Sequence, residues 1–388
     1  MGSIRNKSLL EALEGICNVD VDSVNPQVAT ALPFKAHNQT SNQVICANTM
    51  VLPEYQGLLS EKVKQFGNQG WEEVFNRVMV QFCADNIDNI TNRVLVQISP
   101  SRVYNKEKVL EQAYAFDQAF KDAGISRDKY AIKISTTGPA MSAAAQLNKE
   151  GIRVLGTSLF SLPQAIAASQ AGCLYISPYF NEVAAYEDDS LMHKGSDPAL
   201  TVGCYRYVFK IRTDALQHPM APRLSQILDA YTKLYHETGR DQPLIVIASN
   251  ANIAEVLATA ELGCQHITIL AHHLKELQET PLDEAALGRF PFLRNPPAKK
   301  QAPYYKNLKT PQRFLGHLGV DPLAGPDWDG KLADIHTDYL ADNGKLLGEA
   351  MESDAAVVKK MKDVLGAFNG GDAKAREAIE AEMAKLNV

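Results

Sequence analysis

The chain has 388 residues, 45% of them hydrophobic, and a formal net charge of −6 at pH 7. Such a chain can bury a sizeable core, and charges spread along it disfavour a dedicated nucleic-acid or membrane surface. No apolar run reaches the roughly 18 to 20 residues that span a bilayer, and the first thirty residues lack a basic-then-apolar leader. We therefore expect a cytoplasmic protein that acts on a small molecule.

The six cysteines are widely separated, with no CxxC pair and no histidine at metal-ligand spacing. We interpret them as reduced and mostly buried, and we predict no metal and no other cofactor. They are Cys17, Cys46, Cys83, Cys173, Cys204 and Cys264.

Short β-branched runs alternate with Ala-rich helical segments through most of the chain. Pro139 begins one predicted helix and Gly151 ends it, while Ser161 and Gln164 have capping-box spacing at the start of the next. The predicted strands are 93–98, 130–135, 152–157, 174–177, 244–249 and 266–270, and the predicted helices are 106–123, 139–150, 161–172 and 252–262.

Strands that alternate with helices of this length imply an α/β fold with a parallel sheet, and their repetition favours a closed (β/α)8 TIM barrel. No GxGxxG or GxxxxGK[ST] motif supports a nucleotide fold. We predict a barrel body over 1–280 that includes a polar insertion at 187–222, a Pro-rich loop region over 281–330 packed on the barrel, and C-terminal helices over 331–388. The helices are predicted at 332–350 and 354–386, the second interrupted at Gly370-Gly371. They would either cover the barrel mouth or pack across the boundary of a homodimer.

Lys133 is the first candidate for catalysis. Strand alternation places it on one face with Ala131 and Ser135, opposite the bulkier Ile132 and Ile134. That face would point into the barrel, where loss of hydration lowers a lysine pKa and populates the neutral amine that attacks a carbonyl. The alternative is a lysine whose stem is buried while its ammonium pairs with a carboxylate.

Hydroxyl groups at neighbouring strand ends favour the catalytic interpretation. Thr157 and Ser177 each end a predicted strand, and Tyr179 follows the second. All three are expected to project over the same barrel mouth as Lys133 and to relay protons there. Taken one at a time, each is also consistent with a turn or capping role.

Several motifs of this region resemble the transaldolase family, and the resemblance covers most of residues 30–280. It implies that Lys133 is a Schiff-base lysine and that Thr157 and Ser177 help to form the site. The motifs are Ile132-Lys133-Ile134-Ser135-Thr136-Thr137, Lys149-Glu150-Gly151-Ile152, Gln164-Ala165 and Ile176-Ser177-Pro178-Tyr179.

The chain also departs from the family pattern. His37 stands where the resemblance expects the acid/base aspartate of the first strand, and it is either a general base or a hydrogen-bonded core histidine. Gln97 replaces a glutamate. Glu182 and Ala251 replace two arginines that would hold a sugar phosphate, which predicts an unphosphorylated or differently held substrate.

Gln97, Thr157 and Tyr179 match the trio that positions the catalytic water in fructose-6-phosphate aldolase, a close relative within the resemblance. They favour aldol chemistry on a small-molecule carbonyl substrate over transfer of a dihydroxyacetone unit. The substrate-binding residues predicted beside them are Asn42, Ser177, Ser249, Glu182 and Ala251.

Three alternatives stay open at this stage. A pentose-phosphate transaldolase would take its phosphate contacts from basic residues of the long insertions. A binding or regulatory protein would keep the barrel without its acid/base groups. In the third, Lys133 stabilises charge without forming an imine. The basic residues available to the first are Arg206, Lys210, Arg212 and Arg223.

Overall fold

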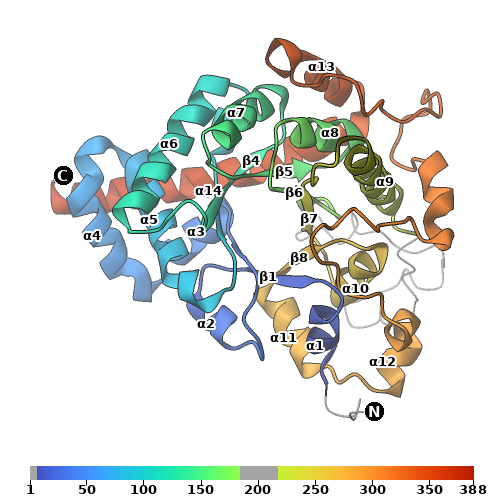
Figure 1. The fold of residues 1–388 in the computed structure, drawn as a ribbon. Coiled ribbons are helices and arrows are strands. Elements are labelled where there is room, and N and C mark those ends of the chain that lie inside the picture. The colour runs from blue at the N-terminus through green and yellow to red at the C-terminus, as the bar shows by residue number, and fades with distance from the viewer. Residues whose placement is uncertain (1–6, 184–216) are drawn as a thin grey trace.

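Eight parallel strands close into a barrel in the computed structural model, which describes residues 7–183 and 217–388. Figure 1 shows the strands gathered at the centre with helices around them, so the predicted TIM barrel is confirmed. The strands are β1 (Asn18–Asp22), β2 (Gln39–Thr40), β3 (Val94–Gln97), β4 (Tyr130–Ser135), β5 (Val154–Leu159), β6 (Tyr175–Pro178), β7 (Leu244–Ile247) and β8 (His266–Leu270).

Local capping residues mark the ends of several helices. Thr137 caps α7 by accepting a hydrogen bond from Ala140 N at 3.3 Å, and Gly263 ends α10 in the left-handed conformation. The helices of the described chain are α1 (Leu9–Glu14), α2 (Pro26–Thr30), α3 (Gln43–Met50), α4 (Gln56–Phe66), α5 (Trp71–Asn86), α6 (Lys106–Asp122), α7 (Gly138–Lys149), α8 (Leu162–Gln170), α9 (Ala221–Thr238), α10 (Ile253–Leu262), α11 (Ala271–Glu279), α12 (Glu284–Arg289), α13 (Ala341–Glu352) and α14 (Ala355–Leu386).

Strand alternation sorts the apolar side chains into two cores. The larger core lies between strands and helices and includes Ile132 and Ile134 of β4. A small second core takes Ala131 of β4 together with one side chain from each of four other strands, so it is the interior of the barrel. Its members are Leu95, Ala131, Leu155, Tyr175 and Val246.

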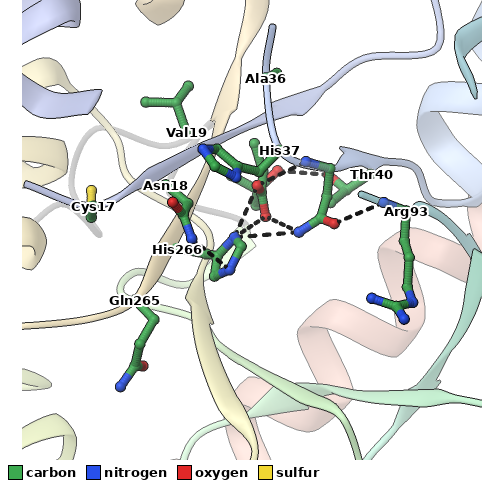
Figure 2. A network of polar contacts seen from close by, with 12 residues as sticks. Cys17, Asn18, Val19, Ala36, His37, Thr40, Arg93, Gln265 and His266 are labelled. Carbon is green, nitrogen blue, oxygen red and sulfur yellow. Dashed lines mark hydrogen bonds and ion pairs between the residues drawn. The ribbon is translucent and has the colours of Figure 1, made fainter. Parts of the chain in front are cut away.

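A polar network fills the amino-terminal end of the barrel. The Asp20 carboxylate accepts hydrogen bonds from Asn38, at 3.0 Å to its backbone N and 2.8 Å to Nδ2, and lies 3.1 Å from His266 Nδ1. The other ring nitrogen of His266 lies 3.0 Å from Asn18 Nδ2 (Figure 2). These groups are almost fully buried, and their mutual hydrogen bonds offset the cost of removing them from water.

Several boundaries differ from the sequence predictions. Ser161 does begin α8, but its side chain makes no capping hydrogen bond, and Gln164 instead accepts one from Phe160 N. Residues 332–340 are not helical, so α13 begins only at Ala341. Most of the predicted insertion 187–222 lies outside the described residues, and within 281–330 the structure has α12 and short 3-10 turns.

None of the helices in the described part of the chain is long and apolar enough to cross a membrane.

The long helix α14 is continuous, in contrast to the predicted interruption at its two glycines. It packs along α3, α4 and α5 at one side of the barrel (Figure 1). Gly371 lies against the backbone of α3, where an added Cβ would come within 2.7 Å of Gln43 C and Val44 N. The glycine is therefore required for the close approach of α14 to the helix that follows β2.

Replacing Gly371 with Ala is expected to lower the free energy of unfolding by about 1 to 3 kcal/mol, because the methyl group overpacks the contact with α3. Gly370→Ala is the matched control. An added Cβ at Gly370 meets nothing within 4 Å, so this change should be neutral or stabilise by up to about 1 kcal/mol. Urea unfolding of both variants measures the difference, and equal midpoints would contradict the packing described.

Candidate active site

Lys133 lies inside the barrel, near the carboxyl end of β4. Its side chain lies on the same face of β4 as that of Ala131, which belongs to the inner core, and Lys133 is 4% exposed. The ammonium donates one hydrogen bond, to the backbone oxygen of Ser41 at 3.1 Å. Within residues 7–183 and 217–388 it forms no ion pair, so its charge is not neutralised by a direct contact.

The Asp22 carboxyl is close enough to Lys133 to influence its charge. Burial lowers the pKa of the Lys133 ammonium, and the negative charge of Asp22 offsets only part of that effect. Burial likewise raises the pKa of Asp22, opposed by Lys133 and by a hydrogen bond from Thr40. The two pKa values are displaced toward each other, because burial disfavours the charged form of both groups.

A hydroxyl chain holds Asp22 in place from the neighbouring strands. Thr40 Oγ1 donates to Asp22 Oδ1 at 2.6 Å and lies 2.6 Å from Thr268 Oγ1. A threonine hydroxyl has a single proton, so Thr268 must be the donor to Thr40. Asp22 was not among the residues selected from the sequence, although the alternation in Asn18–Asp22 is a readable strand signal.

His37 lies at the opposite end of the barrel from Lys133. The first strand is β1, and His37 comes two residues before β2, with its backbone N bonded to Val19 O at 2.9 Å. Its ring bonds to Glu14 Oε1 at 2.9 Å and lies edge-on to His266 (Figure 2). The structure thus does not bring His37 to the lysine, and a carboxylate, Asp22, occupies the end of the first strand.

Thr157 and Tyr179 meet in the same interior. Thr157 lies on the same face of β5 as the inner-core residue Leu155, Tyr179 directly follows β6, and Thr157 Oγ1 donates to Tyr179 OH at 3.2 Å. Burial raises the pKa of Tyr179, so its hydroxyl stays protonated, and the charge of Asp22 adds to this shift. Ser177 lies two residues after Tyr175 on the same face of β6 and is 2% exposed.

Gln97 is paired in register with Lys133 and is oriented by α3. Its Nε2 donates to Gln43 Oε1 at 2.8 Å, while Gln43 Nε2 donates to the backbone oxygen of Gln97 at 2.9 Å. Among the described residues, the buried Gln97 Oε1 accepts no hydrogen bond. A buried acceptor of this kind is suited to a water molecule or a substrate hydroxyl.

Two further predicted substrate contacts flank the carboxyl ends of β2 and β7. Asn42 caps α3 by accepting from Ile45 N at 3.0 Å, which leaves its amide NH2 free to act as a donor. Ser249 follows β7 in a left-handed conformation, with φ at 62°, and in the described structure its buried Oγ has no partner. Unusual backbone conformations of this type persist where surrounding structure supports them, often at functional sites.

Glu182 and Ala251 stand at the two positions where the family resemblance expects phosphate-binding arginines. Glu182 pairs with Lys359 and, at 3.3 Å, with Lys360, both from α14. Burial favours the neutral acid, but these lysines outweigh it and lower the pKa of Glu182. At the second position the backbone N–H of Ala251 donates to Glu255 at 2.7 Å. Glu182 is therefore an ion-paired carboxylate, and by itself it gives no reason for repelling a phosphate.

Arg223, one of the basic residues considered for phosphate binding, is already engaged. Its guanidinium pairs with Asp321 at 2.9 Å and Asp354 at 2.7 Å, and donates to the backbone oxygen of Phe160 at 2.9 Å. It thereby joins the Pro-rich region to the start of α14. The other three candidates, Arg206, Lys210 and Arg212, lie outside the described residues.

Five of the six cysteines fall within the described chain, and all five are buried free thiols. Burial raises the pKa of Cys46, which is near Lys133, to about 12. Cys204 lies outside the described residues. In residues 7–183 and 217–388 no group of three or more His, Cys, Asp or Glu side chains is placed to hold a metal ion.

A parallel eight-stranded barrel with a buried lysine and an acid near its carboxyl end has the layout of a barrel enzyme. Residues 18–309 match the family described as Transaldolase/Fructose-6-phosphate aldolase. The transaldolase of Yersinia pseudotuberculosis serotype O:3 (strain YPIII) is 26% identical over 351 residues, which are 89% of this chain and 98% of the relative. The chain belongs to the transaldolase/fructose-6-phosphate aldolase family.

Solved structures show only weak similarity. An IMP dehydrogenase/GMP reductase-like protein from Corynebacterium glutamicum ATCC 13032 Kitasato has a TM-score of 0.39 and 11% identity, over 65% of this chain and 63% of its own. The thiamine phosphate pyrophosphorylase from Pyrococcus furiosus has a TM-score of 0.33 and 11% identity, over 71% of this chain and 98% of its own. Similarity at this level says nothing about function.

Proposed function

We propose that this enzyme of the transaldolase/aldolase type makes or breaks a C–C bond next to a carbonyl, through a Schiff base on Lys133. The observation that carries the proposal is the Lys133 ammonium, buried inside the barrel with one backbone acceptor and beside Asp22. An unshifted lysine is neutral in only about one molecule in several thousand at pH 7, so the lowered pKa supplies the nucleophile.

The reaction begins when the neutral amine of Lys133 adds to the substrate carbonyl to give a carbinolamine. Loss of the carbinolamine hydroxyl as water, with a proton from Asp22, leaves an iminium ion. As the C–C bond breaks, its electron pair moves into the iminium to form an enamine, and Asp22 accepts the proton of the substrate hydroxyl that becomes the aldehyde. Protonation of the enamine and addition of water then release the product and the lysine.

Gln97, Thr157 and Tyr179 are proposed to hold the water that takes part in dehydration and hydrolysis. The Thr157–Tyr179 hydrogen bond and the unpartnered Gln97 Oε1 support this assignment. Two hydroxyls and an amide position water without removing its proton, which favours aldol addition and cleavage over group transfer. Asn42, Ser177 and Ser249 are proposed to contact the substrate.

The substrate is proposed to be unphosphorylated. Support comes from Ala251, which has no charge, and from Glu182, whose lysine partners are already paired with it. The alternative is a sugar phosphate held by Arg206, Lys210 and Arg212, and the experiment below separates the two. A catalytically lapsed binding protein, the third candidate, has no specific observation in its favour.

Borohydride reduction with a panel of carbonyl compounds tests the Schiff base. Dihydroxyacetone and fructose are expected to give a reduced adduct on the Lys133 peptide, detected by mass spectrometry, and fructose 6-phosphate and sedoheptulose 7-phosphate little or none. Lys133→Met should abolish the adduct, whereas Lys129→Met, at an exposed lysine before the same strand, should not.

The possible outcomes fall into distinct classes. Adducts formed equally well by the phosphorylated sugars would overturn the substrate proposal and leave the lysine assignment intact. Absence of an adduct with every compound would overturn the Schiff-base assignment and support a binding protein.

Asp22→Asn tests the proton carrier. The amide keeps the shape and still accepts from Thr40. The imine should therefore still be trapped on Lys133 at long incubation, although it forms more slowly without the Asp22 proton, and the turnover number should fall about 100- to 10,000-fold. Asp128→Asn, at an exposed acid before β4, is the matched control and should leave turnover unchanged. Turnover of Asp22→Asn at the wild-type rate would exclude Asp22 as the acid/base group.

A further inference from the structure

A pocket lies at the end of the barrel opposite to Lys133. It has a volume of about 560 Å³, opens to solvent, and is lined by the Pro-rich segment 297–314, by α9 and by the end of α10. Gly263 lines it, two residues before Gln265 leads into β8 at the amino-terminal end of the barrel. This volume is within the usual range for small-molecule sites, roughly 300 to 1,000 Å³.

The charge of the pocket is opposite to that of the chain. Its lining has four basic side chains and one acidic one, Glu261, whereas the whole chain has a net charge of −6. Two of the basic groups are already paired, Lys299 with Glu14 and Arg313 with Glu261. The other two are Lys300 and Lys309, and in the part of the chain that is described neither forms an ion pair.

Lys300 is held in a defined position. Its ammonium donates to the backbone oxygen of Gly263, and a Cβ added to that glycine would lie 2.8 Å from Lys300 Nζ. Burial lowers the pKa of Lys300 to about 8, only partly offset by the thiols of Cys264 and Cys17. An ammonium has three N–H donors, so Lys300 keeps two for a ligand, and a bound anion would replace the solvation lost on burial.

The remaining walls are apolar. Proline rings and two aromatic side chains line the pocket, and they offer flat surfaces that water solvates poorly. An organic group can pack there while its charged end meets the lysines. The wall residues are Pro297, Pro303, Pro311, Tyr304 and Phe314.

We propose that this pocket binds a small organic phosphate, whose phosphate group contacts Lys300 and Lys309 and whose organic part packs on the proline and aromatic walls. Two lysines without carboxylate partners match the double negative charge of a phosphate monoester, and lysine binds phosphate as a point charge. The site is separate from Lys133, so it rests on no step of the proposed reaction.

Calorimetric titration of the full chain with phenyl phosphate tests the proposal. Phenyl phosphate is expected to bind more tightly than inorganic phosphate, and phenol not to bind. Lys300→Met should weaken binding at least about tenfold, because a hydrogen bond to a charged group is lost. Lys306→Met, at an exposed lysine of the same segment outside the lining, is the matched control and should change nothing.

A site-specific measurement accompanies the titration. Phenyl phosphate should protect Lys300 from acetylation by acetic anhydride and leave Lys306 reactive, as measured by peptide mass spectrometry. If Lys300→Met does not fold, Lys309→Met provides the same comparison. Unchanged affinity in a folded Lys300→Met or Lys309→Met variant, equal affinity for inorganic phosphate, or no protection of Lys300 would each overturn the proposal.

Discussion

The proposed chemistry depends on the burial of the Lys133 amine away from water, without a carboxylate in direct contact with it. Lys133 has a single backbone acceptor, and it feels the charge of Asp22 without forming an ion pair with it among the described residues. A direct ion pair would hold the lysine protonated, and full exposure would leave its pKa at the ordinary value. The interior of the barrel provides the intermediate condition, in which desolvation outweighs the attraction of Asp22 and the amine can become neutral.

Strand alternation points Lys133 into the barrel, and the barrel keeps its buried polar network and its proposed catalytic groups at opposite ends. The amino-terminal end is closed by the mutual hydrogen bonds of Asp20, Asn38 and His266, and the inner apolar core lies above it. The groups proposed for chemistry come next, at the carboxyl ends of the strands. Helix α14 packs on α3, the helix that orients Gln97 through Gln43. The C-terminal extension thus supports the site from outside the barrel.

Local sequence patterns predicted several strand bounds and the inward direction of Lys133. Features that depend on contacts between distant parts of the chain could not be predicted in this way. The bounds of β4 and β8 follow from β-branched runs, and the inward direction of Lys133 follows from period-two alternation. The role of Asp22 could not be predicted because β1 places three polar side chains inward, so the strand has no apolar inner face to mark it. The Lys359 partner of Glu182 lies 177 residues away on α14, next to its second partner Lys360, and no local pattern could reveal that the charge of Glu182 is offset. The continuity of α14 through Gly370-Gly371 likewise depends on packing against α3.

The central claim concerns the protonation of Lys133 in the free enzyme. A ¹³C NMR titration of the lysine Cε signals, with Lys133 assigned by comparison with Lys133→Met, measures its pKa directly. We expect a pKa below the ordinary value of 10.5, because burial disfavours the ammonium. A pKa at or above 10.5 would show that Asp22 holds the lysine charged, and it would contradict the proposed nucleophile.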